Sequence, residues 1–429
     1  MKKVISLLLL HAFPLLIWAQ AGHIMQGIGA HNMSMGGAAT GQPLDINGAL
    51  HWNPAGITQF DGKIFSANLG LFFSSPELSS TVPTPQGPFS GVTKDDRGIS
   101  PMPALAFVWG KKESKHHFGV SAFGISGFGV TFPQNNSNPI NFPQDQGGFG
   151  RIESDYLLMQ VGFTYAYALS DRLSIGVAPN LNYAALELAP NPLASPSQTK
   201  GYPVSDKASA IGFGGQVGIF FNTESGFKLG ASYKTQQYFG DFTFSNTYLD
   251  GSPAPEVAFT MNYPSIISLG AGYSNKKIDL ALDYRFVNYE GTDGFEKSGW
   301  TPTASVAGFG WKNMSIISAG IQYKGIQKLP IRVGYTYSSN PIDPELAFFS
   351  TPATAIIKNA FQLGLGYEFS SRFALNAVYH HGSSSGSTSG QLMSPMMITP
   401  SNPLGKIPGS EVSYNMTTDM FMLGVNYRF

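Results

Sequence analysis

The segment Phe361–Phe369 reads FQLGLGYEF and alternates between two kinds of residue. Its odd-numbered positions hold Phe, Leu, Leu, Tyr and Phe, and its even-numbered positions hold Gln, Gly, Gly and Glu. Because successive side chains of a strand point to opposite faces, this pattern predicts a strand with one apolar and one polar side. A slip of one residue would turn Glu368 toward the apolar side, so the register is well specified.

The same alternation recurs along the chain in segments of about ten or more residues. Such strands suit a barrel in a membrane, with one face toward lipid and the other toward a lumen. The apolar positions that share a face are Leu157, Met159, Val161, Phe163, Tyr165 and Tyr167; Ile211, Phe213, Val217, Ile219 and Phe221; Phe227, Leu229, Ala231 and Tyr233; Ile278, Leu280, Leu282, Tyr284 and Phe286; and Ile331, Val333, Tyr335 and Tyr337. Glycine is common on the opposite faces, where a close approach or a bend favours it.

The connections between these segments alternate in length. Six are short (Lys111–Lys115, Ser170–Arg172, Thr223–Ser225, Ser274–Lys276, Lys324–Gln327 and Ser370–Arg372), and seven are long and rich in Pro, Ser and Asn (76–99, 133–153, 190–207, 243–254, 294–311, 341–354 and 383–410). Together they join fourteen strands. Outer-membrane barrels have an even strand number, short periplasmic turns and long outer loops. We therefore predict an all-β fold, a 14-stranded antiparallel transmembrane barrel.

The last segment supports a location in the bacterial outer membrane. Phe421, Leu423, Val425 and Tyr427 alternate, and the chain stops on Phe429. A terminal aromatic residue on an amphipathic strand resembles the assembly signal of bacterial outer-membrane proteins. An ordinary edge strand that ends in Phe is the alternative.

Composition bounds the class of protein. Of 429 residues, 12% are charged, 13% are aromatic and 50 are glycine. A soluble protein so poor in charge would leave much of its surface apolar, whereas a surface that faces lipid resolves the difficulty. The 26 basic and 26 acidic residues balance, which gives no reason to expect a nucleic-acid partner. The chain has no cysteine, which excludes disulfides and thiolate metal sites.

The first residues have the pattern of a signal peptide. Lys2 and Lys3 precede the apolar run 4–18, which is too short and too early for a convincing membrane span. Cleavage after Ala19 and cleavage after Ala21 both remain open. An uncleaved anchor is the alternative. Beyond this segment no run of ~20 apolar residues occurs, so we expect an exported chain that crosses no membrane by helices.

The stretch Gly22–Gly62 behaves differently from the strands. It reads GHIMQGIGAHNMSMGGAATGQPLDINGALHWNPAGITQFDG, which is Gly-rich and weakly periodic, and it contains Asn53-Pro54-Ala55 near its end. We interpret it as an N-terminal hatch, a plug inside the lumen. The predicted domains are the signal peptide (1–21), the hatch (22–62) and the transmembrane barrel (63–429).

This stretch resembles the hatch of the FadL family of outer-membrane channels for fatty acids and aromatic hydrocarbons, which includes the TodX-like toluene channels. The residues that carry the resemblance are Gly22, Met35-Gly36-Gly37-Ala38, Asp45 and Trp52-Asn53-Pro54-Ala55-Gly56, together with the later segments Phe118–Pro133, Leu329–Tyr335 and Asn340–Pro344. The resemblance covers nearly the whole mature chain. It implies a 14-stranded barrel in which the Asn-Pro-Ala turn holds the plug against the wall. A turn that merely leads into the first strand is compatible with that role.

Three glycines mark a candidate kink in the third strand. Gly124, Gly127 and Gly129 lie close together, and glycine inside a strand permits a bulge or bend. In the family, an inward kink of the third strand leaves a lateral opening in the wall, so we expect 124–129 to be that kink. The alternative is that these glycines only face a crowded lumen.

Two features bear on the ligand. Lys312 resembles the position of a lysine in the family's ligand site, where it would pair with a carboxylate; a solvated lysine at the base of a loop is the alternative. No arginine occurs near the end of the 172–189 strand, where the family's fatty-acid channels lead us to expect a second cation. Neutral hydrocarbons therefore stay open as ligands beside fatty acids.

Two apolar loop patches are candidates for collecting ligand. They are Leu346-Ala347-Phe348-Phe349 and the run 392–397, which ends in Met396 and Met397. Packing of the loops on each other over the barrel mouth explains them equally well.

We expect an outer-membrane channel for passive uptake of hydrophobic small molecules, held between hatch and barrel and released laterally. The expected partners are that ligand and membrane lipid, and we expect a monomer. A structural or adhesive barrel, or a general porin with an inert plug, is the alternative. The pairs His116-His117 and His380-His381 form no Ser/His/acid or metal-ligand spacing, so we expect no enzyme, cofactor or metal.

Overall fold

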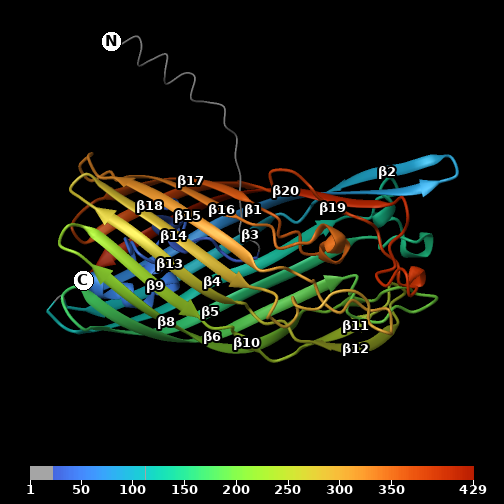
Figure 1. Cartoon of the computed structure of the whole chain (residues 1–429), viewed down its shortest axis with the longest axis horizontal. Helices are drawn as coiled ribbons and strands as arrows, with labels where there is room; N and C mark the ends of the chain where they lie inside the picture. The colour runs from blue at the N-terminus through green and yellow to red at the C-terminus, as the bar shows by residue number, and fades with distance from the viewer. Residues whose placement is uncertain (1–22, 112) are drawn as a thin grey trace, which may run out of the picture.

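The computed structural model describes residues 23–111 and 113–429, so the predicted signal peptide lies outside it. Within these residues, fourteen long strands form a closed barrel (Figure 1). They are β1 (Gly62–Thr84), β3 (Ile99–Gly110), β4 (His116–Phe132), β5 (Ile152–Ala168), β6 (Leu173–Ala189), β8 (Ala208–Asn222), β9 (Phe227–Lys234), β13 (Ser265–Ser274), β14 (Ile278–Asn288), β15 (Met314–Tyr323), β16 (Ile331–Ser338), β17 (Asn359–Glu368), β18 (Phe373–Ser383) and β20 (Glu411–Arg428).

Every wall strand pairs antiparallel with the next one along the chain, and β20 pairs with β1 to close the barrel. The closing ladder runs from Ile64 opposite Arg428 to Thr81 opposite Glu411. Closure matters because unpaired backbone groups are costly in lipid, where water cannot satisfy them. The predicted fold class and strand number are confirmed.

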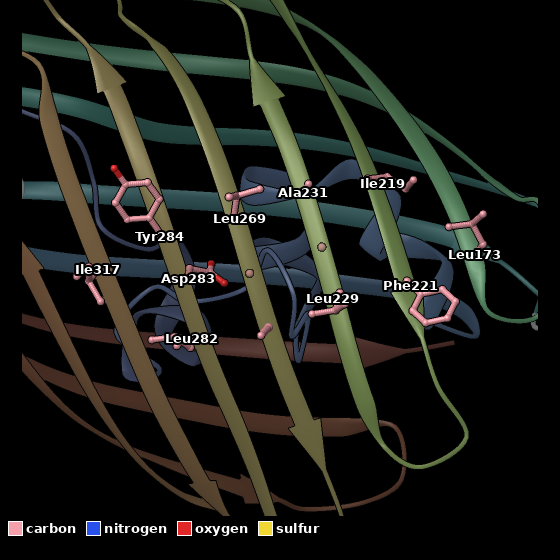
Figure 2. A pocket seen from close by; sticks show the side chains of 13 residues that line it. Leu173, Ile219, Phe221, Leu229, Ala231, Leu269, Leu282, Asp283, Tyr284 and Ile317 are labelled. Atoms are coloured by element: carbon pink, nitrogen blue, oxygen red, sulfur yellow. The ribbon is translucent and has the colours of Figure 1, made fainter.

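The predicted apolar faces lie on the outside of the barrel. Phe361, Leu363, Leu365 and Tyr367 of β17 are all exposed, and Gln362 between them is buried toward the lumen. Figure 2 shows the same alternation elsewhere, where outward side chains border a shallow apolar hollow of about 650 Å³ on the lipid-facing surface. The six short turns lie at the predicted positions.

Four of the predicted long loops contain strands, namely 76–99, 190–207, 243–254 and 383–410. Residues 77–84 of β1 pair with β2 (Gly87–Lys94), so the region predicted as the loop 76–99 is largely a hairpin that extends beyond the wall (Figure 1). Pro83 and Pro88 stand opposite each other near the tip of this hairpin, beyond the ladder with β20, where a strand edge does not need every N–H. The loop predicted at 243–254 spans 235–264 and includes β10 (Tyr238–Phe239), β11 (Phe242–Thr247) and β12 (Pro253–Phe259).

Further short elements lie among the outer loops. Strands β7 (Val204–Ser205), β11 and β12 form a separate three-stranded sheet, and β19 (Thr388–Gly390) adds to β20. The 3-10 helices η2 (Pro139–Asn141), η3 (Gln144–Gln146), η4 (Pro344–Ser350) and η5 (Pro395–Met397) complete this end. No helix among the described residues is long and apolar enough to cross a membrane.

Residues 23–61, which we call the hatch segment, lie inside the barrel (Figure 1). The segment contains α2 (Gly29–Ser34), α3 (Ile46–Trp52) and η1 (Pro54–Gln59). Helix α2 contacts β17, β18 and β20, α3 contacts β3, and η1 contacts β5, β6 and β8. Asp45 begins α3, because its carboxylate accepts the N–H groups of Asn47 and Gly48.

Glycines on the inner face of the wall allow the hatch backbone to approach it closely. A Cβ atom on Gly218 of β8 would lie 2.1 Å from Oδ1 of Asn53, and one on Gly334 of β16 would lie 2.1 Å from the Gly36 nitrogen. These distances leave no room for a side chain. The same holds at Gly176, Gly230, Gly270, Gly320 and Gly364, where the added atom would meet hatch residues.

We expect Gly218→Ala to loosen the hatch while the barrel still forms. The methyl group would collide with Asn53, and overpacking of this kind costs about 1–3 kcal/mol. Limited proteolysis of the refolded protein should cut residues 23–61 faster than in the parent chain. Gly215→Ala on the same strand is the control, since its Cβ would have its nearest neighbour at 3.5 Å. Equal cleavage of both variants would contradict the role of this glycine.

Candidate functional site

Asn53 links the last two helices of the hatch to the wall. It ends α3 and begins η1, where its Oδ1 accepts the Ala55 N–H at 3.1 Å. Its Nδ2 donates to the carbonyl oxygens of Thr40 at 2.9 Å and Ile219 of β8 at 3.0 Å. Pro54 occupies the first position of η1, where a missing N–H is tolerated. The Asn-Pro-Ala turn thus contacts the wall directly.

A buried ion pair on β14 holds the middle of the hatch, and sequence reasoning missed it. Arg285 donates through Nη2 to Asp283 at 2.7 Å and to the carbonyl oxygen of Gly37 at 2.7 Å. The same Asp283 oxygen accepts the N–H groups of Ala39 at 2.8 Å and Thr40 at 2.9 Å. Both charges lie on β14, and their hydrogen bonds to Gly37, Ala39 and Thr40 attach the middle of the hatch to the wall.

The predicted kink in the third barrel strand coincides with a register shift in β4. The shift falls between Gly124 and Ser126, so Ile125 is an extra residue in the ladder with β5. Strands β3 and β4 pair only from Ala104–Phe123 to Trp109–Phe118. Toward the outer end, both strands continue without pairing to each other. A gap in the wall therefore begins at the bulge.

The first residues of the hatch segment pair with the free edge of this bulge. The Met25 N–H donates to the Ile125 carbonyl at 3.1 Å, and the Gly127 N–H donates to the His23 carbonyl at 3.2 Å. The Ser126 hydroxyl donates to the same His23 oxygen at 2.8 Å. The start of the hatch thus satisfies backbone groups that β3 leaves unpaired.

A cavity of about 530 Å³ lies at the gap. It is bounded by inward side chains such as Met25 and Tyr156 and by outward ones such as Ile99 and Leu157, so it joins the lumen side to the lipid side. Gly127 and Gly129 stand opposite Leu157 and Asp155 in the ladder, on the outer face of β4. A Cβ on Gly129 would collide with Arg97, whose guanidinium group forms an ion pair with Asp155 at 2.5 Å.

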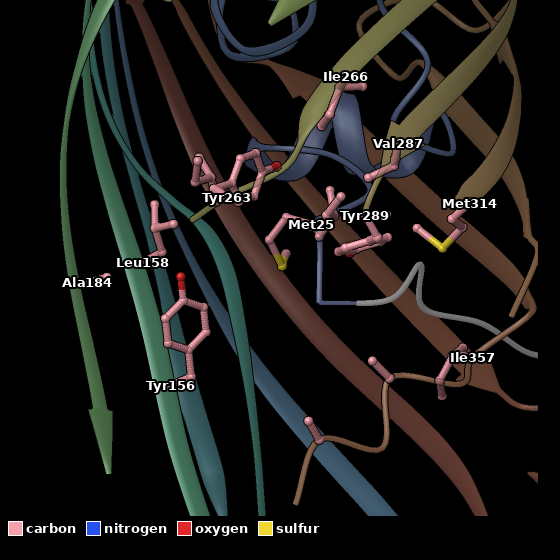
Figure 3. Packing of buried hydrophobic residues seen from close by; sticks show 14 of the residues in the cluster. Met25, Tyr156, Leu158, Ala184, Tyr263, Ile266, Val287, Tyr289, Met314 and Ile357 are labelled. Carbon is pink, nitrogen blue, oxygen red and sulfur yellow. The ribbon is translucent and has the colours of Figure 1, made fainter. Parts of the chain in front are cut away.

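His23 lies at the centre of an aromatic cage, which sequence reasoning did not find. His23 is 1% exposed, and its ring stacks on Phe295 with 5.0 Å between the ring centroids. Its Nδ1 lies 2.7 Å from the Tyr289 hydroxyl. Figure 3 shows Tyr156, Tyr263 and Tyr289 around Met25 in this region. The rings around His23 come from β4, β5 and the long loops, and they are Phe128, Tyr156, Tyr263, Tyr289, Phe295 and Trp311.

The cage could not be read from the sequence because its members are spread over some 290 positions of chain between His23 and Trp311. The one available signal was a cluster of aromatic residues in loops, at Phe295, Phe309 and Trp311. Such residues are unusual in solvated loops and indicate burial.

Lys312 points away from this cage. Its Nζ lies 2.6 Å from Asp343 among the outer loops, and its side chain is largely exposed. The neighbouring Asp343 carboxylate raises the pKa of Lys312. Lys234 is a cation that does face the lumen, and the sequence analysis did not single it out.

Lys234 ends β9 on its inner face and is 2% exposed. Its Nζ donates to Oε1 of Gln160 at 3.2 Å and lies 3.5 Å from Nδ1 of His51. Within the described part of the chain it forms no ion pair. It stands opposite Ile266 of β13, which belongs to the apolar cluster shown in Figure 3. A buried cation with only neutral partners is costly and favours an anionic ligand group nearby.

The two candidate capture patches differ in exposure. Phe348 and Phe349 of η4 are buried and pack against Trp300 at 5.9 and 5.3 Å. Met396 is 92% exposed and Met397 is 41% exposed. The methionines are thus accessible from outside, whereas the phenylalanines form part of the packing of the loops. Among residues 23–111 and 113–429, no three His, Asp or Glu side chains converge as metal ligands.

The family described as outer membrane protein transport protein (OMPP1/FadL/TodX) matches residues 19–429. The chain belongs to this family. It is therefore a transport channel of the outer membrane and no enzyme, as predicted from the sequence. No curated protein matches the sequence.

Solved structures of the family share the fold at low identity. The Pseudomonas putida toluene transporter TodX is 18% identical with a TM-score of 0.69, covering 94% of this chain and 99% of that one. A Pseudomonas aeruginosa FadL homologue is 13% identical with a TM-score of 0.71, covering 95% and 100%. The Ralstonia pickettii toluene transporter TbuX is 18% identical with a TM-score of 0.64, covering 94% and 99%.

We expect acid to weaken the docking of His23. Burial lowers the pKa of its imidazole from 6.5 to about 3, so the docked ring stays neutral where a released ring would take up a proton. Docking is therefore strongest above pH ~6.5 and loses about 1.4 kcal/mol per pH unit below that value, until the pH nears the docked pKa. The phenols of Tyr156, Tyr263 and Tyr289 stay neutral throughout this range.

Hydrogen exchange of the Gly127 amide, which donates to the His23 carbonyl, measures this docking. Opening free energies compared between pH 7.5 and 5.5, corrected for intrinsic exchange, should fall for the parent chain and stay constant for His23→Phe. A parent chain whose opening free energy does not change with pH would contradict the assignment.

Proposed function

We propose that this channel takes up hydrophobic small molecules by passive diffusion, binds them in the aromatic cage between hatch and wall, and releases them sideways through the β3–β4 gap. The observation that carries the proposal is the cage itself, which adjoins both the start of the hatch and the bulge of β4. His23 fills the cage at rest. A ligand therefore binds when the first residues of the hatch withdraw.

The position of His23 supports this gating. It is attached to the wall by hydrogen bonds to only a few residues, and its Nε2 is buried without a partner. The rest of the hatch is held by Asn53 and by the pair Asp283–Arg285. The first residues can therefore move while the body of the hatch stays in place.

The cavity at the gap supports lateral release. A hydrophobic ligand gains roughly 0.8 kcal/mol per CH₂ group on leaving water, and passage into lipid keeps that gain. Release into the aqueous periplasm would forfeit it. Gly127 leaves the outer face of β4 without a side chain beside the gap, whereas the space outside Gly129 is taken by the Arg97 guanidinium group.

Two observations bear on the ligand class, and each favours a different ligand. The aromatic cage and the toluene transporters among the similar structures favour aromatic hydrocarbons. The buried ammonium of Lys234 favours a ligand with a carboxylate, such as a fatty acid. Met396 and Met397 offer an apolar surface where either ligand collects first.

A general porin or a purely structural barrel is less well supported. The hatch is buried at almost every residue, and the region next to it is lined by aromatic and aliphatic side chains. A polar-solute porin needs a wide polar lumen instead.

Competition binding tests the proposal and ranks the ligands. A fluorescent fatty acid should bind the refolded barrel and be displaced by unlabelled fatty acid or toluene, and maltose should not displace it. Lys234→Met should weaken fatty-acid binding by about tenfold, because a charged hydrogen bond is lost, and leave toluene unaffected. Lys312→Met is the control and should bind like the parent chain. A folded barrel that binds none of these would favour the porin or structural alternative.

Filling the gap tests lateral release. Gly127→Trp should fold, keep ligand binding and lose most of its uptake in cells that lack another channel for the ligand. Gly215→Trp, on the outer face of β8 away from the gap, should retain uptake. Normal uptake by a correctly folded Gly127→Trp variant would count against a lateral exit.

A further inference from the structure

A second cavity lies on the opposite side of the hatch from the aromatic cage. It has a volume of about 440 Å³ and opens among the short turns, which are periplasmic in outer-membrane barrels. The hatch contributes His31, Asp45 and Ile46 to its lining. The wall contributes polar residues near the periplasmic ends of β15 to β18 and β20, among them Gln322, Arg332, Asn376 and Asn426.

Arg332 is the central charge of this cavity. It lies on the inner face of β16 and is 2% exposed. Its Nε donates to Oε1 of Gln322 at 2.6 Å, and its Nη1 donates to Oδ1 of Asn376 at 2.9 Å. Both partners are neutral amides, and the described residues provide neither an ion pair for Arg332 nor a hydrogen bond for its Nη2. Burying a cation without a counter-charge is costly.

The surrounding structure makes room for the guanidinium group. A Cβ on Gly366 of β17 would lie 3.0 Å from Nη2 of Arg332 and 2.8 Å from Pro330. The glycine at this position therefore leaves space beside the atoms of Arg332 that lack a partner. Across the cavity, Nε2 of His31 is buried and also has no hydrogen-bond partner.

The other charges around the cavity leave it with a positive excess. Lys324, Arg372 and Arg428 line it together with Arg332, against the carboxylates of Asp45 and Glu368. Lys324 is already paired with Asp279 at 2.8 Å. The Asp45 oxygens are engaged with the backbone N–H groups of Asn47 and Gly48 at the start of α3.

We propose that this cavity binds a small oxyanion, a phosphate or a carboxylate, between Arg332 of the wall and His31 of the hatch. Arginine presents donors in a planar fork that matches the oxygens of both groups, and a neutral imidazole can add an N–H from Nε2. The bound anion supplies the direct ion-pair partner that Asp45 and Glu368, which also line the cavity, do not provide for Arg332. The site is independent of the hydrophobic route, because it lies on the periplasmic side of the hatch.

Binding at this place joins the hatch to the barrel. His31 belongs to α2 and Asp45 caps α3, so an anion held by Arg332 contacts the segment that has to stay seated during transport. A ligand that binds only the docked hatch stabilises it by mass action. Occupancy of the site should therefore slow hydrogen exchange in α2 and α3.

Titration of the full chain in detergent with inorganic phosphate, and separately with acetate, tests the site. Calorimetry should show saturable binding of at least one anion, and the two titrations identify which source of oxygens is preferred. Arg332→Gln should weaken binding roughly tenfold or more, and Arg332→Lys should retain part of it. Lys276→Gln, at an exposed turn that does not line the cavity, is the charge-matched control and should bind nearly as the parent chain does.

Hydrogen exchange separates this site from unspecific attraction. Saturating anion should protect amides of α2 and α3 in the parent chain but not in His31→Phe, a variant that keeps the barrel charges. The proposal is overturned if the parent chain shows no saturable binding at high millimolar anion. It is also overturned if Lys276→Gln weakens binding as much as Arg332→Gln, since that result would indicate general attraction to the positive charges of the turns.

Discussion

The backbone of the hatch lies directly against the backbone of the barrel wall, and the remaining features of the structure depend on this contact. It exists because glycines of β6, β8, β9, β13, β15, β16 and β17 carry no side chain where the hatch passes. With larger residues there, residues 23–61 would not fit the lumen in this position. The close approach brings backbone groups of the hatch within hydrogen-bonding reach of Asp283 and Arg285, and it lets the Asn53 side chain donate to the Ile219 carbonyl of β8. The hatch is thereby held by its middle and its end.

The start of the hatch is held by a few hydrogen bonds to β4, and a channel needs such a weakly held segment in order to open. Residues 23–25 pair with the bulge of β4, at a place in the wall where β3 and β4 separate. Unpaired backbone groups in a membrane need partners, and the hatch supplies them. When residues 23–25 withdraw, only a few hydrogen bonds to β4 are lost. The Asp283–Arg285 pair meanwhile keeps the rest of the hatch in place. The hatch therefore consists of a fixed body and a short movable start, residues 23–25.

The barrel was largely predictable from the sequence because its pattern is local. Alternation in FQLGLGYEF identifies the outer face of β17 without knowledge of any other strand, and turn lengths then give the strand count. The prediction of a loop over 76–99 was wrong because its prolines suggested irregular structure, whereas the end of a hairpin tolerates them. Lumen contacts escaped prediction for a different reason. An inward Lys234 or Arg332 has the same local pattern as any polar lumen residue, and only the closed barrel shows which groups it meets.

A crystal structure with a brominated aromatic ligand would test the central claim most directly, because anomalous scattering locates the bromine without ambiguity. We expect the bromine to lie among Tyr156, Tyr263 and Trp311, with the His23 ring displaced from the cage and the Asp283–Arg285 pair unchanged. Bromine found only on the outer loops or the lipid-facing surface, with His23 still stacked on Phe295 at saturating ligand, would contradict binding between hatch and wall.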